Sequence, residues 1–135
     1  MPVKVRYYNC LNNGFGIIVW PQIRSNNNTE NKLWDGRDHS GFKLNISKSI
    51  QQRGPSCECI VLNYYVHSAQ DVTVDLNGCN LPQGTTFILA CNTFDGPDGW
   101  DSGTVYEYDS TANVTAYGQA EGGVWTVKLV GKGAH

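Results

Sequence analysis

The chain has 135 residues, with 10 Lys and Arg against 12 Asp and Glu, which gives a formal net charge of −2. This length suits one domain, so we expect a single domain over residues 1–135. The charge offers no basic surface for a phosphate backbone, which argues against nucleic acid as a partner, and no apolar run approaches the ~20 residues of a transmembrane helix.

The start of the chain does not resemble a secretory signal peptide. The first four residues are Met-Pro-Val-Lys, and no apolar core of signal-peptide type follows them. We therefore expect one of two origins: cytoplasmic synthesis with non-classical release, or secretion with a leader that was removed and replaced by Met1.

The composition predicts an all-β fold with little or no helix. Val, Ile, Thr and the aromatic residues favour strands, while 15 Gly, 5 Pro and many Asn and Asp favour turns. Turn signals separate about nine short strands at spacings of about 8–15 residues, and no repeat of fixed period is present. This pattern is typical of an antiparallel β-sandwich.

In the first part of the chain, two strands flank a turn signal. Residues 3–9 alternate in polarity, residues 15–21 are largely apolar, and Asn12-Asn13-Gly14 lies between them, so we expect an N-terminal hairpin. Residues 24–39 are polar and predict a long surface loop, interrupted by Leu33 and Trp34.

The middle of the chain predicts four further strands. Their ranges are 41–50, the apolar and central run 59–67, 72–76, and 85–92. Turn signals at Gly54-Pro55, at Asn77-Gly78 and over residues 81–84 separate them.

The last part of the chain predicts a loop followed by three strands. Residues 94–103 are rich in Gly and Asp and read as the loop, and the tail 131–135 is expected to be loose. The strands are predicted over residues 105–108, 114–117 and 124–130.

Five cysteines leave at least one thiol free or paired between chains; they are Cys10, Cys57, Cys59, Cys79 and Cys91. Cys57 and Cys59 would point to one face of a strand, too far apart for an easy bridge. Buried free thiols and disulfides to distant cysteines stay open as alternatives, and the lack of a second short Cys pair argues against structural zinc.

No catalytic motif is present, and we expect no enzymatic activity. His39 is the one histidine in a charged cluster, and a general acid–base pair with Glu58 or Glu107 is the alternative that would make the protein a small glycan hydrolase. The nucleophile-elbow, zinc-protease and Walker motifs do not occur.

Two polar segments place a Trp beside planar amide or carboxylate groups. Sugars present apolar C–H faces and many hydroxyls, so a sugar site needs an aromatic plane next to such groups. The candidate ligand-binding residues are Trp34, Asp35, Arg37, Asp38 and His39 in the first segment, and Asn92, Asp98, Trp100 and Asp101 in the second.

The exposure of the tryptophans decides between two interpretations. Trp34 and Trp100 lie in polar segments, so we expect exposed stacking platforms, whereas capping of the core is the alternative. Trp20 and Trp125 lie in predicted strands and are expected in the core or on a sheet face. Asp95, Asp98 and Asp101 leave a calcium site open, although the segment lacks the order of an EF-hand loop; no other cofactor is expected.

The N-terminal third resembles the opening of thaumatin-like proteins. The matching pieces are Asn9-Cys10, Val19-Trp20-Pro21-Gln22-Ile23, and Gly41-Phe42-Lys43-Leu44 with Ser47. The resemblance implies a β-sandwich and a defence or glycan-binding function. Extra residues separate Cys10 from Trp20, and five cysteines do not supply that family's dense disulfide set, so no functional residue is carried over. In size and strand content alone, the chain is also similar to small fungal β-sandwich lectins and to aegerolysin-type membrane-binding proteins.

The sequence therefore predicts a non-enzymatic, lectin-like protein whose partners are glycans or glycoconjugates. Single sugar sites are weak, so we expect a homo-oligomer, such as a dimer, that presents several sites. The first alternative is a membrane-binding or pore-forming defence toxin that contacts lipid through Tyr and Trp, because the chain holds 7 Tyr and 4 Trp.

Overall fold

The computed structural model describes residues 1–45, 50–53, 63–66 and 70–135, and the side chains of 1–45 and 70–135. Nine strands form two mixed sheets, which confirms the predicted all-β, sandwich-like fold. They are β1 (Val3–Val5), β2 (Tyr7–Asn12), β3 (Val19–Ser25), β4 (Lys32–Asp35), β7 (Gln70–Asp75), β8 (Thr86–Thr93), β9 (Gly99–Tyr108), β10 (Thr115–Glu121) and β11 (Lys128–Ala134).

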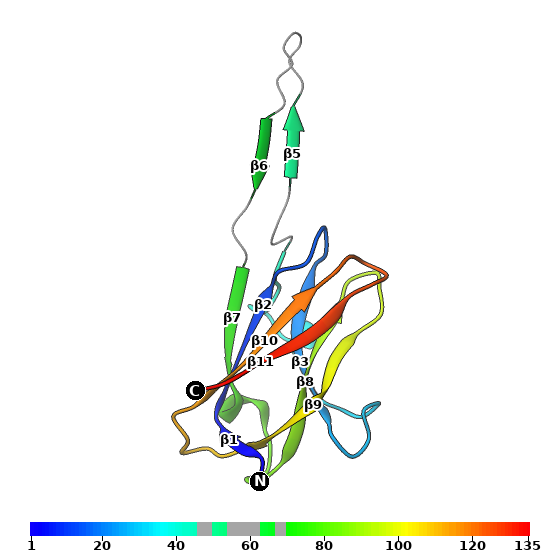
Figure 1. The fold of residues 1–135 in the computed structure, drawn as a ribbon. Coiled ribbons are helices and arrows are strands. Elements are labelled where there is room, and N and C mark those ends of the chain that lie inside the picture. The colour runs from blue at the N-terminus through cyan, green and yellow to red at the C-terminus, as the bar shows by residue number, and fades with distance from the viewer. Residues whose placement is uncertain (46–49, 54–62, 67–69) are drawn as a thin grey trace.

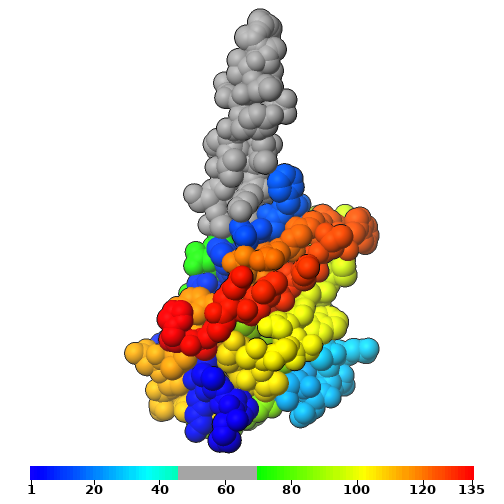
Figure 2. Space-filling model, viewed as in Figure 1, coloured from blue at the N-terminus to red at the C-terminus, as the bar shows by residue number. Residues whose placement is uncertain are grey.

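One sheet has five strands in the order β1-β9-β8-β3-β4, and the other has four in the order β11-β10-β2-β7. The four-stranded sheet faces the viewer in Figures 1 and 2, with β10 and β11 in front of β3 and β8. β5 (Ile50–Arg53) and β6 (Asn63–Val66) pair with each other in a separate two-stranded sheet. The described part of the predicted strand 59–67 is therefore not central.

The chain changes sheets at Arg6, so the predicted single strand over residues 3–9 is wrong. β1 pairs in parallel with β9, whereas β2 pairs in parallel with β10 and antiparallel with β7. The Arg6 backbone spans the step, since its N–H donates to Val114 and its carbonyl accepts from Leu76. The predicted N-terminal hairpin is also wrong, and the two parallel pairings make both sheets mixed rather than purely antiparallel.

The core lies between the two sheets and follows the period-two alternation of the strands. β2 turns Tyr8 and Cys10 inward, and β8 turns Phe87, Leu89 and Cys91 inward. All five side chains are at most 1% exposed. The alternate residues of each strand point to the two outer faces; they include the polar Asn9 on β2 and Asn92 on β8, and also the apolar, buried Ile88 and Ala90 on β8.

The structure corrects the predicted loop over residues 24–39. Arg24 and Ser25 continue β3, and β4 follows from Lys32. Trp34 pairs with Ile23, faces the core and is only 9% exposed, so the prediction of an exposed ring at this position is wrong. The 3₁₀ turn η1 (Gly36–Asp38) then begins at Asp35, whose carboxylate accepts from the N–H of Arg37.

Two predictions near the C-terminus are also wrong. Trp125 lies in a turn rather than in a strand, and its side chain is 78% exposed. The tail expected to be loose forms β11, which pairs with β10. By contrast, β7 and β8 lie where the sequence predicts strands, with the 3₁₀ turn η2 (Leu76–Cys79) between them. The predicted strand 41–50 is not formed as one strand. Within residues 41–45, only Leu44 forms a bridge, to Val19, and Ile50 begins β5. Residues 46–49 lie outside the described residues.

The described cysteines Cys10, Cys79 and Cys91 are free and buried, as the buried-thiol alternative predicts. Burial raises the pKa of the Cys10 thiol to about 12 and that of Cys79 to about 12. Cys57 and Cys59 lie outside the described residues. Among those residues, neither 3₁₀ turn has the length or apolar character to span a bilayer.

Candidate functional site

The outer face of the five-stranded sheet carries a row of polar and aromatic side chains. Along β3, Val19 and Ile23 pack into the core, so the alternating positions Trp20, Gln22 and Arg24 point outward. The register places Asp35 of β4 beside Gln22 and Asn92 of β8 beside Trp20. Three strands therefore supply one continuous polar surface.

The carboxylate of Asp35 is a centre of this surface. Its Oδ2 accepts a hydrogen bond of 2.9 Å from Nε2 of Gln22 and one of 2.8 Å from Nδ2 of Asn92. Its Oδ1 accepts from the backbone N–H of Arg37 at 3.0 Å. Asp35 is 8% exposed, so these donors replace the water that the buried carboxylate has lost.

The guanidinium of Arg24 is the second centre, and it is also buried. Its Nε donates to Oε1 of Gln22 at 2.6 Å, its Nη1 to the carbonyl of Thr29 at 2.7 Å, and its Nη2 to Asp98 at 2.7 Å. The guanidinium also lies 4.4 Å from the centre of the Trp100 ring. Lys32 approaches both acids, 3.8 Å from Asp98 and 3.9 Å from Asp35. The hydrogen bonds fix the orientation of these side chains.

A hollow opens beside this hydrogen-bonded network. Its volume is about 200 Å³, and its lining residues are Ile18, Trp20, Arg37, Lys43 and Phe94. The Arg37 guanidinium lies 4.6 Å from the Trp20 ring centre and 5.4 Å from that of Phe94. Its Nη1 donates to Oδ1 of Asn92 at 3.4 Å, which links the hollow to the network. We call this site the aromatic hollow.

The structure brings together five of the nine residues that the sequence proposed for ligand binding. They are Asp35, Arg37, Asn92, Asp98 and Trp100, all in or beside the network. Trp100 is in β9 rather than in a loop and is 39% exposed, with Arg24 lying against its ring.

The other four proposed residues lie elsewhere. Trp34 is on the inner side of β4, where His39 stacks on its ring at 5.2 Å. Asp38 is exposed in η1. Asp101 accepts from the backbone N–H of Gly131 at 3.0 Å, in β11 of the other sheet. The four are therefore not part of the aromatic hollow.

In the described part of the chain, no set of side chains is assembled for calcium binding or for acid–base catalysis by His39. Asp98 pairs with Arg24, Asp101 contacts β11, and no cluster of three His, Cys, Asp or Glu side chains able to hold a metal occurs among the described residues. Asp95 is exposed in the turn before β9. His39 stacks on Trp34 and forms no ion pair with any carboxylate whose side chain is described, while Glu58 lies outside those residues.

The sequence did not indicate Gln22, Arg24, Lys43 or Phe94 as site residues, and Trp20 was expected in the core or on a sheet face without a binding role. The signal for three of them was present in the alternation of Val19-Trp20-Pro21-Gln22-Ile23-Arg24, where every second residue is apolar. Read as a strand that continues beyond Pro21, this segment puts Trp20, Gln22 and Arg24 on one face. Nothing local in the sequence indicates that Lys43 and Phe94 come to the same place.

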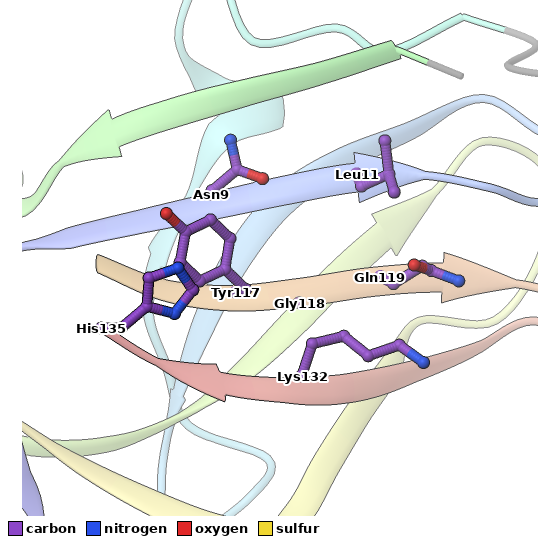
Figure 3. A pocket seen from close by; sticks show the side chains of 7 residues that line it. All are labelled: Asn9, Leu11, Tyr117, Gly118, Gln119, Lys132 and His135. Carbon is purple, nitrogen blue, oxygen red and sulfur yellow. The ribbon is translucent and has the colours of Figure 1, made fainter. Parts of the chain in front are cut away.

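A second hollow, of about 270 Å³, lies on the outer face of the four-stranded sheet. Figure 3 shows Asn9 and Leu11 on one strand, Tyr117 and Gln119 on the next, and Lys132 on the third. The rings of Tyr117 and His135 stack at 4.6 Å. The amide groups are held from the side, since Nδ2 of Asn9 donates to Asp71 and Nε2 of Gln119 donates to Glu121. In this hollow the two aromatic side chains stack on each other.

The chain matches no protein-family model, and no curated protein or solved structure is significantly similar to it. The thaumatin-like resemblance of the N-terminal third therefore stays a prediction. The functional argument depends on the geometry of the aromatic hollow and its network.

Proposed function

We propose that the protein binds carbohydrate, without catalysing a reaction, and that the aromatic hollow holds the sugar. One observation carries this proposal: the planar guanidinium of Arg37 is held against Trp20 and Phe94 at the edge of the hollow and is hydrogen-bonded to Asn92. An aromatic surface suits the C–H face of a sugar, and planar polar groups suit its hydroxyls. Both kinds of group are present here within one site.

The size of the hollow favours a single sugar unit. Its volume of about 200 Å³ is smaller than the ~300–1,000 Å³ of pockets that enclose drug-sized ligands. A small ligand makes few contacts, so the affinity of one site is expected to be low. Self-association, with several copies of the hollow presented together, would raise the avidity. Sedimentation velocity at several protein concentrations tests this expected oligomer.

The experiment that tests the function is a glycan array probed with the wild type and with two variants, Trp20→Ala and Phe94→Ala. We expect both variants to lose binding, because each removes an aromatic wall of the hollow. Phe15→Ala is the matched control, since Phe15 is also an exposed aromatic residue, 60% exposed, but does not line the hollow. Circular dichroism verifies that the Trp20→Ala variant, which changes a half-buried residue, still folds. Unchanged binding by both variants would remove the proposed site.

A second candidate function is binding to a membrane surface, and one observation favours it. Phe15 is 60% exposed and Trp125 is 78% exposed, and their loops are neighbours because the N–H of Phe15 donates to the carbonyl of Gly122 at 2.8 Å. Aromatic side chains on such loops suit the water–lipid boundary.

Vesicle co-sedimentation distinguishes the two functions. Membrane binding predicts that the wild type pellets with phosphatidylcholine vesicles free of glycolipid, and that Phe15→Ala with Trp125→Ala stays in the supernatant. Carbohydrate binding predicts pelleting only when the vesicles carry a glycolipid, with competition by the free sugar.

A further inference from the structure

The arginines with described side chains differ in what neutralises their charge. Arg6 forms a two-point contact with Asp75, at 3.0 Å from Nε and 2.7 Å from Nη2. Arg24 pairs with Asp98 at 2.7 Å. Arg37, by contrast, forms no ion pair within the described part of the chain, and its side chain donates a hydrogen bond to the neutral amide of Asn92.

Arg37 is nevertheless held in place. Its backbone N–H is bound by the carboxylate of Asp35, its Nη1 by Asn92, and its guanidinium lies against two aromatic rings. Its Nε and Nη2 donate to no group among the described residues. The result is an oriented pair of donors with a full positive charge, of the kind that matches a carboxylate at two points.

The rest of the aromatic hollow adds a second positive charge and no negative one. Lys43 lines it, and none of the five lining residues carries a carboxylate. The nearest acid in the network, Asp35, already accepts hydrogen bonds from Gln22, Asn92 and Arg37. The chain as a whole has a net charge of −2, so this concentration of positive charge is a local feature.

We propose that the sugar bound in the aromatic hollow is acidic, with its ring against Trp20 and Phe94 and its carboxylate against Arg37 and Lys43. This inference depends on the proposed carbohydrate-binding function and adds the ligand class to it. A charged acceptor is favoured over a hydroxyl because a charge-assisted, two-point hydrogen bond is about twice as strong as a neutral one. A sulfated sugar shares the same anionic chemistry, so the test includes one.

The experiment is a calorimetric titration of the wild type with three methyl glycosides: a hexose, the corresponding hexuronate, and the hexose 6-sulfate. We expect the hexuronate to bind about tenfold more tightly than the hexose, since 1.4 kcal/mol of additional charge-assisted bonding corresponds to a factor of ten. The preference should weaken as salt is raised, because the charges of the hollow are partly exposed. Tighter binding of the hexose 6-sulfate than of the hexuronate would support an anionic sugar as the ligand and identify it as sulfated.

Three charge variants locate the preference. Arg37→Gln and Lys43→Gln should each weaken hexuronate binding by a larger factor than hexose binding, so that the ratio of the two affinities falls toward one. Lys132→Gln is the matched control, because Lys132 is an exposed lysine that lines the second hollow, on the opposite sheet. It should change neither affinity.

The outcomes separate the two proposals. Equal affinity for hexose and hexuronate, or a hexuronate preference that survives Arg37→Gln, overturns the acidic-sugar inference and leaves carbohydrate binding intact. Failure of the wild type to bind any glycan, on the array or in titration, overturns the proposed function and this inference with it. Arg37 is exposed, so its replacement is not expected to prevent folding, and a thermal melt verifies this.

Discussion

The hydroxyl of Tyr8 donates a hydrogen bond of 2.8 Å to the backbone carbonyl of Ala90, and so joins the two sheets through the core. Tyr8 is 0% exposed, and burial raises the pKa of its phenol well above the ordinary value. Tyr8→Phe should lower the free energy of unfolding by about 1 kcal/mol, because it removes this bond and keeps the ring.

Urea denaturation measures this difference, and Tyr7→Phe is its control. Tyr7 is half-buried on the outer face of the same strand, where its contact with Arg6 involves the ring and not the hydroxyl. We expect this variant to match the wild type. Equal stability of Tyr8→Phe and Tyr7→Phe would mean that the inter-sheet bond contributes nothing.

Gly118→Ala should destabilise the fold through Tyr8. A Cβ at position 118 would meet Cε1 of Tyr8 at 3.0 Å, its hydroxyl oxygen at 3.1 Å and Cδ1 of Leu89 at 3.3 Å. Overpacking of this kind costs about 1–3 kcal/mol, and the thermal midpoint should fall accordingly. Gly78→Ala is the control, because a Cβ there meets nothing within 4 Å. A thermal midpoint of Gly118→Ala equal to that of the wild type would show that Tyr8 and Leu89 can move to accommodate the added methyl group.

Asp98→Asn should destabilise the network beside the aromatic hollow. The substitution leaves the Arg24 side chain, 6% exposed, without its charged partner at 2.7 Å. Removing one member of a fully buried ion pair costs about 3–5 kcal/mol. Since the Asp98 side chain is 18% exposed, we expect Asp98→Asn to lower the free energy of unfolding by about 2 kcal/mol, as measured by urea denaturation. Asp95→Asn, on an exposed position of the same turn, should have no measurable effect. A wild-type midpoint for Asp98→Asn would contradict the role given to this pair.

The pair of Arg6 and Asp75 predicts a pH dependence. The hydrogen bond from Arg6 lowers the pKa of the Asp75 carboxyl below its ordinary value of 3.8. A carboxyl with a lowered folded-state pKa contributes stability that is present above 3.8 and is lost as the pH falls through the folded-state pKa.

The stability of the wild type relative to Asp75→Asn should therefore be constant near neutral pH and decline in acid below 3.8. Thermal melts of both proteins across that range measure the difference. Asn keeps the cap that residue 75 provides to the N–H of Asn77, so the comparison isolates the charge. A difference that grows in acid would contradict the assignment.

The sequence predicted best the elements whose evidence is local. β7 and β8 alternate or are continuously apolar, and turn residues border both, so their positions followed from periodicity. The sequence did not predict the step between β1 and β2, which is visible in the burial of Val5 and Tyr8. Val5 and Tyr8 both face the core, and a spacing of three does not fit one continuous strand.

The sequence predicted the types of residue that form the candidate site, but only some of the residues themselves. Trp34 and Trp100 both occur among polar residues, yet the pairing of Trp34 with Ile23 turns one ring inward, and the pairing of Trp100 with Ala90 turns the other outward. Strand register, which decides the face, is set by contacts between distant segments. Trp125 was misplaced for a similar reason, since the turn that exposes it depends on Gly122 at a φ of 90°.

The parallel pairing of β1 and β2 has a consequence for the rate of folding. β1 pairs with β9, and β2 pairs with β10, so both strands have partners roughly a hundred residues later in the chain. Neither main sheet is complete without the strands β9 to β11. Folding is therefore expected to be slow, on the roughly millisecond-to-second scale of proteins with distant strand pairings.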